Sequence, residues 1–253
     1  VLTKHVCHAR DLPNDAGTEP ITVKSLSASL NAAVRAAAKP SGGGAEGSKG
    51  FAKPATAVAM YLLRVLEATS RKESGADAAA DVACAEAVEA YGDALEMFKS
   101  NKNCRLKTPF FQAAFERHPA LAAELLPAVA GLLTAGGDKA SSRAEYLRAE
   151  GAKLLNVVLS LGKKRSPAVC KSAAKHKKVI AAAIVAAIAA PCRNRGARAD
   201  VAKTLTQCCE AFARASSDGP LSTLMDPNAV VDAVAAQFSV PGMPQKGVNT
   251  LTR

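Results

Sequence analysis

The sequence contains no tryptophan and only three tyrosines, and aromatic residues make up 4% of its 253 residues, although 49% are hydrophobic. Strands are enriched in aromatic and β-branched residues, which alternate with polar residues when the strand is half-buried. That alternation is lacking here, and alanine dominates the apolar residues. Alanine is a strong helix former, and the length allows one large core or two small ones. We therefore predict an all-α fold.

The cysteines form no Cys-x-x-Cys pair. Their number is odd, and they are Cys7, Cys84, Cys104, Cys170, Cys192, Cys208 and Cys209. This pattern is typical of a reducing compartment, and we expect Cys208 and Cys209 to pack in or near the core. The only close grouping of possible metal ligands is His5, Cys7 and His8, which lacks a second half at metal-finger spacing. We expect no metal site and no cofactor.

No apolar run reaches the roughly 18 to 20 residues that a membrane span requires. The most apolar run is Val179 to Ala190, which Pro191 ends. We therefore expect no membrane partner. Because the sequence shows no constellation of residues typical of an enzyme, we also expect no small-molecule substrate. The sequence begins at Val1 without methionine, signal peptide or transit peptide, so we expect a piece of a longer protein, with targeting signals outside it.

Acidic residues are missing from one long basic segment. Residues 163–178 carry seven lysines or arginines and no acid, and they lead directly into the apolar run. Residues 139–198 hold fourteen basic residues against Glu145 and Glu150, whereas the rest of the chain is nearly balanced within the net charge of +11. Such a single-sign face favours a polyanion, with nucleic acid ahead of membrane. The alternatives are a solvated surface and a nuclear import signal.

Apolar residues at spacings of three and four predict a series of helices. We expect helices over residues 23–38, from 55 onward, over about 76–98, and then starting near 108, 119, 142, 166, 201 and 226. Residues 1–50 would comprise the first helix and a flexible linker at 40–50, residues 51–240 a helical-repeat-like domain, and residues 241–253 a polar tail. Antiparallel helices with short breaks and no strands predict an irregular helical-hairpin stack, an α-solenoid of the HEAT or armadillo kind, although the sequence shows no clear period.

Several helix starts carry capping signals. Thr108 precedes Pro109, and Ser166 precedes Pro167, so each hydroxyl is expected to cap a helix. Ser142 and Glu145 match a capping box. His118, before Pro119, is expected to bond exposed backbone at a helix junction.

The candidate nucleic-acid-binding residues lie in the basic segment and in the loop expected after Pro191. Lys171, Lys175 and Lys178 should form one column on a helix surface, since they recur at spacings of four and three. Arg143, Arg148 and Lys153 should begin the same basic face. No aromatic residue is interleaved, so we expect contact with phosphates and no sequence-specific reading of bases. The full set is Lys163, Lys164, Arg165, Lys171, Lys175, Lys177, Lys178, Arg193, Arg195 and Arg198.

One segment resembles a known family. Tyr91, Ala94-Leu95 and Phe98 are followed by Leu106-x-x-Pro109-x-Phe111-x-x-x-Phe115-x-Arg117-His118-Pro119-x-Leu121 and Leu125-Leu126-Pro127. Residues 88–133 thus resemble the C-terminal part of the Myb-binding protein 1A family, also called DNA polymerase V or DNA polymerase phi. The resemblance implies a nucleolar or nuclear protein in ribosome biogenesis and ribosomal RNA transcription, and in some members a transcriptional co-regulator.

Three functional hypotheses follow. The first is a non-enzymatic scaffold that contacts ribosomal RNA or pre-ribosomal particles through the basic face. The second is a transcriptional co-regulator module that binds protein partners or DNA. The third is an enzyme, which we do not expect, because nucleotidyl transfer needs carboxylates that hold two metal ions about 4 Å apart. The acids here are scattered, and Gly42 to Gly44 lack the strand and the Lys-Ser/Thr of a phosphate loop. Phosphorylation of Ser166, inside the basic segment, would weaken polyanion binding.

Overall fold

The computed structural model describes residues 22–38, 48–73, 84–101, 104, 106–135, 141–163, 166–190, 207, 210–211 and 227–238. Within these ranges the chain is helical and contains no strand, which confirms the prediction of an all-α fold. In chain order the helices are α2 (Val23–Ala38), α3 (Ser48–Glu73), α4 (Ala85–Ser100), α5 (Thr108–Arg117), α6 (Pro119–Thr134), α7 (Ser142–Lys163), α8 (Pro167–Lys175), α9 (Lys177–Ala189) and α11 (Pro227–Phe238).

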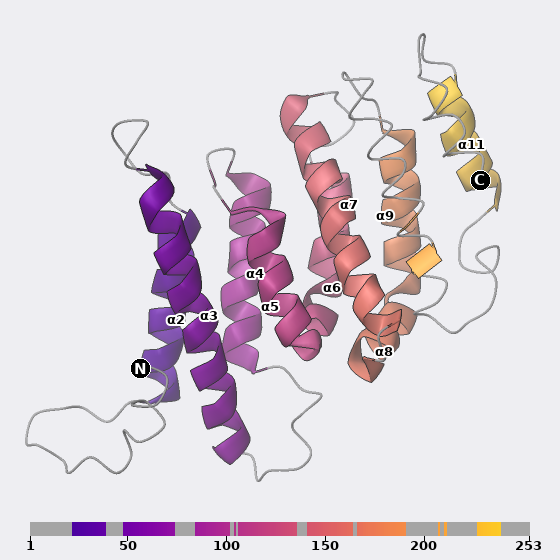
Figure 1. The fold of residues 1–253 in the computed structure, drawn as a ribbon. Coiled ribbons are helices and arrows are strands. Elements are labelled where there is room, and N and C mark those ends of the chain that lie inside the picture. Colours follow the sequence, from indigo (N-terminus) through magenta and orange to yellow (C-terminus); the bar gives the residue numbers. More distant parts are fainter. Residues whose placement is uncertain are drawn as a thin grey trace, which may run out of the picture.

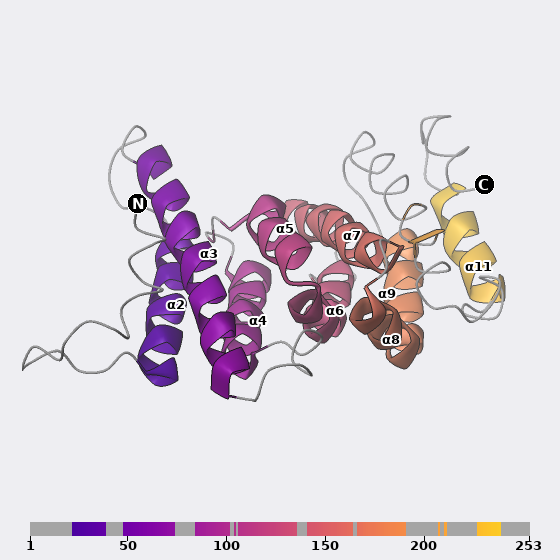
Figure 2. The ribbon, with the colours of Figure 1, turned by 60° about the horizontal axis from the view of Figure 1, so that its bottom comes forward.

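The helices lie side by side in roughly the order of the sequence, from α2 and α3 at one end to α9 and α11 at the other (Figure 1). Helix α6 is central, because it packs against α4, α5, α7, α8 and α9. Figure 2 shows α5 and α7 next to one another along α6. Helix α2 packs against α3 and α4, so the helix of the predicted N-terminal segment shares its core with the helices that follow.

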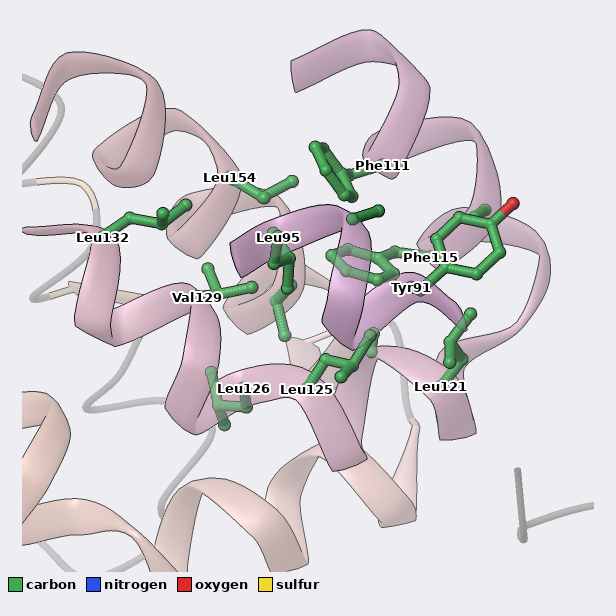
Figure 3. Packing of buried hydrophobic residues seen from close by; sticks show 14 of the residues in the cluster. Tyr91, Leu95, Phe111, Phe115, Leu121, Leu125, Leu126, Val129, Leu132 and Leu154 are labelled. Carbon is green, nitrogen blue, oxygen red and sulfur yellow. The ribbon is translucent and has the colours of Figure 1, made fainter. Parts of the chain in front are cut away.

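The core is continuous from α2 to α9, and α6 contributes nine buried residues to it. Figure 3 shows part of this core, with buried side chains of α4, α5, α6 and α7 close together. The predicted stripe of α6 is buried: Leu121, Leu125, Leu126, Val129 and Leu132. The aromatic residues of α4 and α5 meet beside it, with ring centroids 5.5 Å apart for Tyr91 and Phe110 and 5.9 Å apart for Phe98 and Phe111. Tyr91, Phe98, Phe110, Phe111 and Phe115, which are five of the ten aromatic residues in the sequence, thus lie where α4, α5 and α6 join.

Two predicted helix boundaries differ from the structure. Helix α3 begins at Ser48, inside the segment predicted as linker, because one glycine costs a long helix only about 1 kcal/mol. Helix α4 begins at Ala85, because the backbone of Cys84 is extended and its carbonyl accepts the first helical hydrogen bonds. Residues 76–83 of the predicted helix lie outside the described residues. The predicted helix near residue 201 lies mostly outside the described residues, as do Cys208, Cys209 and the predicted tail.

The predicted caps were wrong in detail. Ser141, not Ser142, caps α7, since its hydroxyl accepts a hydrogen bond from the Ala144 N–H at 3.0 Å. Thr108 lies inside α5 and donates its hydroxyl hydrogen bond to Glu150 of α7. Ser166 does occupy the capping position of α8, but its side chain makes no capping hydrogen bond.

Candidate nucleic-acid interface

Helix α8 carries the centre of the predicted binding segment, and its inner side is fixed to α6. Val169 and Ala173 are buried. Between them, Ser172 Oγ donates a hydrogen bond of 2.6 Å to the carbonyl oxygen of Ala123. That carbonyl lies four residues before Pro127, which has no N–H to donate to it. A hydroxyl of α8 therefore satisfies the α6 carbonyl that the proline leaves unbonded.

The outer side of α8 is basic. Lys171 and Lys175 are both exposed, and at a spacing of four they lie on the same face of the helix. The inward direction of Val169, Ser172 and Ala173 fixes this outward direction. The sequence pattern therefore placed both lysines correctly on a solvent-facing surface.

The predicted single column of Lys171, Lys175 and Lys178 was wrong, because the helix is interrupted at His176. This residue has φ −104° and ψ 16°, and α9 begins at Lys177. The helical hydrogen bonds continue past it, from His176 N to Ser172 O at 2.9 Å and from Ile180 N to His176 O at 3.1 Å. The interruption is thus a bend, and it lets α8 and α9 both pack against α6.

Lys178 lies in the first turn of α9 and is exposed, whereas Lys177 is half-buried. We call Lys171, Lys175 and Lys178, with the bend at His176, the basic corner. The apolar run of α9 behind it is buried on one side, with Ile180, Ile184 and Ala187 in the core, but Val179 is 52% exposed.

Few acids surround the basic corner. Neither α8 nor α9 contains an acid, and α6 has one, Glu124, which is exposed. Helix α11, which packs against α9, contributes Asp232. Among the described residues no ion pair or hydrogen bond involves the side chains of Lys171, Lys175 or Lys178. Their charges are therefore uncompensated within this part of the chain.

The basic face does not begin on α7, contrary to expectation. Arg148 is only 2% exposed and lies within the core. Arg143 extends over the rings of Phe98 and Tyr146 and donates hydrogen bonds to the carbonyls of Phe98 and Asn101, at the end of α4. The guanidinium thus binds carbonyls at the C-terminal end of a helix, a role that the linear sequence did not reveal.

Lys153 is exposed but paired with Glu150 at 2.7 Å. Burial raises the pKa of the Glu150 carboxyl, but hydrogen bonds from Lys153 and Thr108 outweigh burial and hold this pKa below its usual value. This cluster links α5 to α7 and is separate from the basic corner.

The remaining predicted site residues are not tested by the structure. Lys163 ends α7, and Lys164, Arg165, Arg193, Arg195 and Arg198 lie outside the described residues. They stay predictions.

His118 has a different partner from the one expected. Its Nδ1 pairs with Glu67 Oε2 of α3, so its side chain joins the corner between α5 and α6 to a neighbouring helix instead of bonding backbone. Within the described ranges, no three or more His, Cys, Asp or Glu residues are grouped so that they could hold a metal ion. No helix in those ranges is long and apolar enough to cross a membrane.

No protein-family model, curated protein or solved structure matches this chain. The resemblance of residues 88–133 to the Myb-binding protein 1A family therefore remains a prediction.

Proposed function

We propose that this chain is a non-enzymatic helical scaffold that binds nucleic acid through the basic corner. The observation that supports the proposal is the exposure of three ammonium groups around one bend, with no acid in either helix. Like charges held together on helix surfaces repel one another. A phosphate backbone would relieve this repulsion and release its own condensed counterions, which drives binding.

Ribosomal RNA, or a pre-ribosomal particle in the nucleolus, is the proposed target, and it rests on the family resemblance. The three arginines after Pro191 would add guanidinium forks that suit phosphates and unpaired bases. The basic segment itself contains no aromatic residue on which a base could stack. Recognition would therefore follow the shape and charge of the backbone.

We further propose that the helices form an irregular stack of the HEAT or armadillo kind. Two features support it: successive helices lie side by side along the molecule, and most packing joins helices near in sequence. In such a stack each unit contacts its neighbours, and basic bends can gather along one edge.

A transcriptional co-regulator module that binds protein partners or DNA is the alternative, and its protein-binding form is the one that predicts a different surface. That form would need an apolar surface, yet the large exposed hydrophobic residues of the described ranges are Val58, Tyr146, Val179 and Val231, on four separate helices. Scattered single residues of this kind need no partner. This distribution favours the nucleic-acid proposal.

The test is binding of the chain to a structured ribosomal RNA fragment, with duplex DNA as competitor. One variant changes Lys171, Lys175 and Lys178 to glutamate. The matched control changes Lys24, Lys99 and Lys107 to glutamate as well. These are exposed lysines at other places in the structure, so the net charge changes by the same amount in both variants. We expect the first variant to lose RNA binding and the control to retain most of it. Equal losses would indicate that net charge alone is responsible, and would contradict a localised site.

A further inference from the structure

The chain contains two residues with a hydroxyl directly before proline, Thr108 and Ser166, and their environments differ. Thr108 is 7% exposed, and its hydroxyl donates to Glu150 Oε2 at 2.5 Å. Ser166 is partly exposed, and its hydroxyl has no hydrogen-bond partner among the described residues. Of the two positions, Ser166 is the one whose hydroxyl is unbonded among the described residues and partly exposed to a modifying enzyme.

The backbone holds Ser166 in place between α7 and α8. Its N–H donates to the Leu161 carbonyl at 3.2 Å, and its carbonyl accepts from the Cys170 N–H at 3.2 Å. Its conformation is extended, with φ −91° and ψ 102°. The side chain therefore lies at the start of the helix that bears Lys171 and Lys175.

Ser166 also lies inside the strongest charge block of the chain. Lys163, Lys164 and Arg165 precede it, and no acid occurs between residues 163 and 178. A phosphate there would carry about −1.5 to −2 charges near neutral pH. It would pair with basic side chains that would otherwise be able to bind a polyanion. The start of α8 tolerates a negative charge, because helix N-termini carry partial positive charge, so α8 should stay folded.

We propose that Ser166 is a proline-directed phosphorylation site that weakens nucleic-acid binding by the adjacent basic corner. This regulatory role rests on the proposed function above. In the reaction, a proline-directed protein kinase transfers the γ-phosphoryl group of ATP to Ser166 Oγ. The Oγ–phosphorus bond forms, the bond between the γ-phosphorus and the bridging oxygen of ADP breaks, the hydroxyl proton passes to the kinase base, and ADP leaves.

The size of the effect follows from the counterion relation. If the phosphate neutralises about two cations, the logarithmic salt slope should become shallower by roughly 1.8 for a duplex and about 1.4 for a single strand. At moderate salt this corresponds to RNA binding weakened on the order of tenfold. The neutral Ser166→Ala variant should bind like wild type, since it changes no charge.

The first experiment tests the acceptor. The full chain is incubated with ATP and a cyclin-dependent protein kinase, and mass spectrometry locates the phosphate. We expect modification of Ser166, none of Thr108, and none at this position in Ser166→Ala. Modification of Thr108 with Ser166 untouched would overturn the assignment.

The second experiment compares unmodified chain with chain carrying phosphoserine at 166, inserted during synthesis, for binding to a structured ribosomal RNA fragment across a salt series. Circular dichroism checks that both are equally helical. Weaker binding with a shallower slope supports the proposal. Equal binding by both proteins would overturn the regulatory role and leave the proposed function intact, whereas no binding by the unmodified chain would overturn both.

Discussion

Ser172 of α8 donates a hydrogen bond to the Ala123 carbonyl of α6, which Pro127 leaves without its usual helical partner. A proline inside a helix removes the hydrogen bond to the carbonyl four residues earlier. Here that loss coincides with the point where the basic helix docks. The position of Lys171, which precedes Ser172, thus depends on a hydrogen bond between two helices far apart in sequence.

This relationship predicts a coupling between Ser172 and Pro127. Ser172→Ala should lower the free energy of unfolding by about 1 kcal/mol, because it removes a hydrogen bond from a part-buried carbonyl. In a Pro127→Ala background the new N–H of residue 127 can bond Ala123, so the same change should cost less than about 0.5 kcal/mol. Urea unfolding of the four proteins gives the comparison, with Ser29→Ala, a change at an exposed serine of α2, as a control. Equal costs in both backgrounds would contradict the coupling.

The lack of a side chain at Gly151 allows α6 and α7 to approach one another closely. A Cβ on Gly151 would lie 2.8 Å from the Cβ of Leu132 and 3.3 Å from its carbonyl carbon, so backbone would have to move. Gly151→Ala should therefore destabilise the chain by about 1–3 kcal/mol.

Gly131→Ala is the matched control for Gly151→Ala, because nothing lies within 4 Å of a Cβ at residue 131. There alanine should be neutral or stabilising by up to about 1 kcal/mol, since both glycines are inside helices. Thermal unfolding distinguishes the two variants, and a Gly151→Ala protein as stable as Gly131→Ala would show that the helices are farther apart.

The ionised carboxylate of Glu150 should make the stability of the fold depend on pH. Its folded pKa lies below the usual value near 4.5, so its ionised form stabilises the fold above that pH. The contribution should disappear as the pH falls below about 4.5 and through the folded pKa. Glu150→Gln should therefore be less stable than wild type at pH 7 and approach it in acid. The stability of a Glu124→Gln control, which changes an exposed carboxylate, should follow that of the wild type at each pH. A stability difference that is constant with pH would rule out the ionised carboxylate as its source.

Replacing Arg143 should destabilise the fold, whereas replacing a charged residue that lies only on the surface should not. Arg143→Met removes the donor to the Phe98 and Asn101 carbonyls, and should lower the free energy of unfolding by about 2 kcal/mol, as for hydrogen bonds from charged groups. Lys24→Met, an exposed lysine of α2, should change stability by less than about 0.5 kcal/mol. Denaturant unfolding tests both. If nucleic-acid binding weakened in Arg143→Met without loss of stability, Arg143 would belong to the interface after all.

The sequence predicted helix starts best where proline marked them. Helices α6, α8 and α11 begin at Pro119, Pro167 and Pro227, since proline is suited to the first turn and cannot continue a helix before it. The local sequence pattern could not show whether Ser141 or Ser142 caps α7, because both residues are serine.

The basic corner was predicted in part. Exposure of Lys171, Lys175 and Lys178 followed from helical spacing, but the bend at His176 has no proline or glycine to mark it. The bend accompanies the packing of both α8 and α9 against α6, which is a tertiary feature that local pattern does not show. Arg148 was wrongly predicted to be exposed for a related reason. A single charged residue beside an apolar stripe is expected on the surface unless the positions of the neighbouring helices are known.

The salt dependence of RNA binding tests the central proposal most directly. The dissociation constant is measured from 50 to 200 mM salt for wild type and for the variant with Lys171, Lys175 and Lys178 changed to glutamate. Each lost phosphate contact should reduce the logarithmic slope by about 0.7 to 0.9, so three contacts should reduce it by roughly two to three. A slope that falls by this amount, with much weaker binding, places the interface at the basic corner. An unchanged slope and affinity would contradict the account.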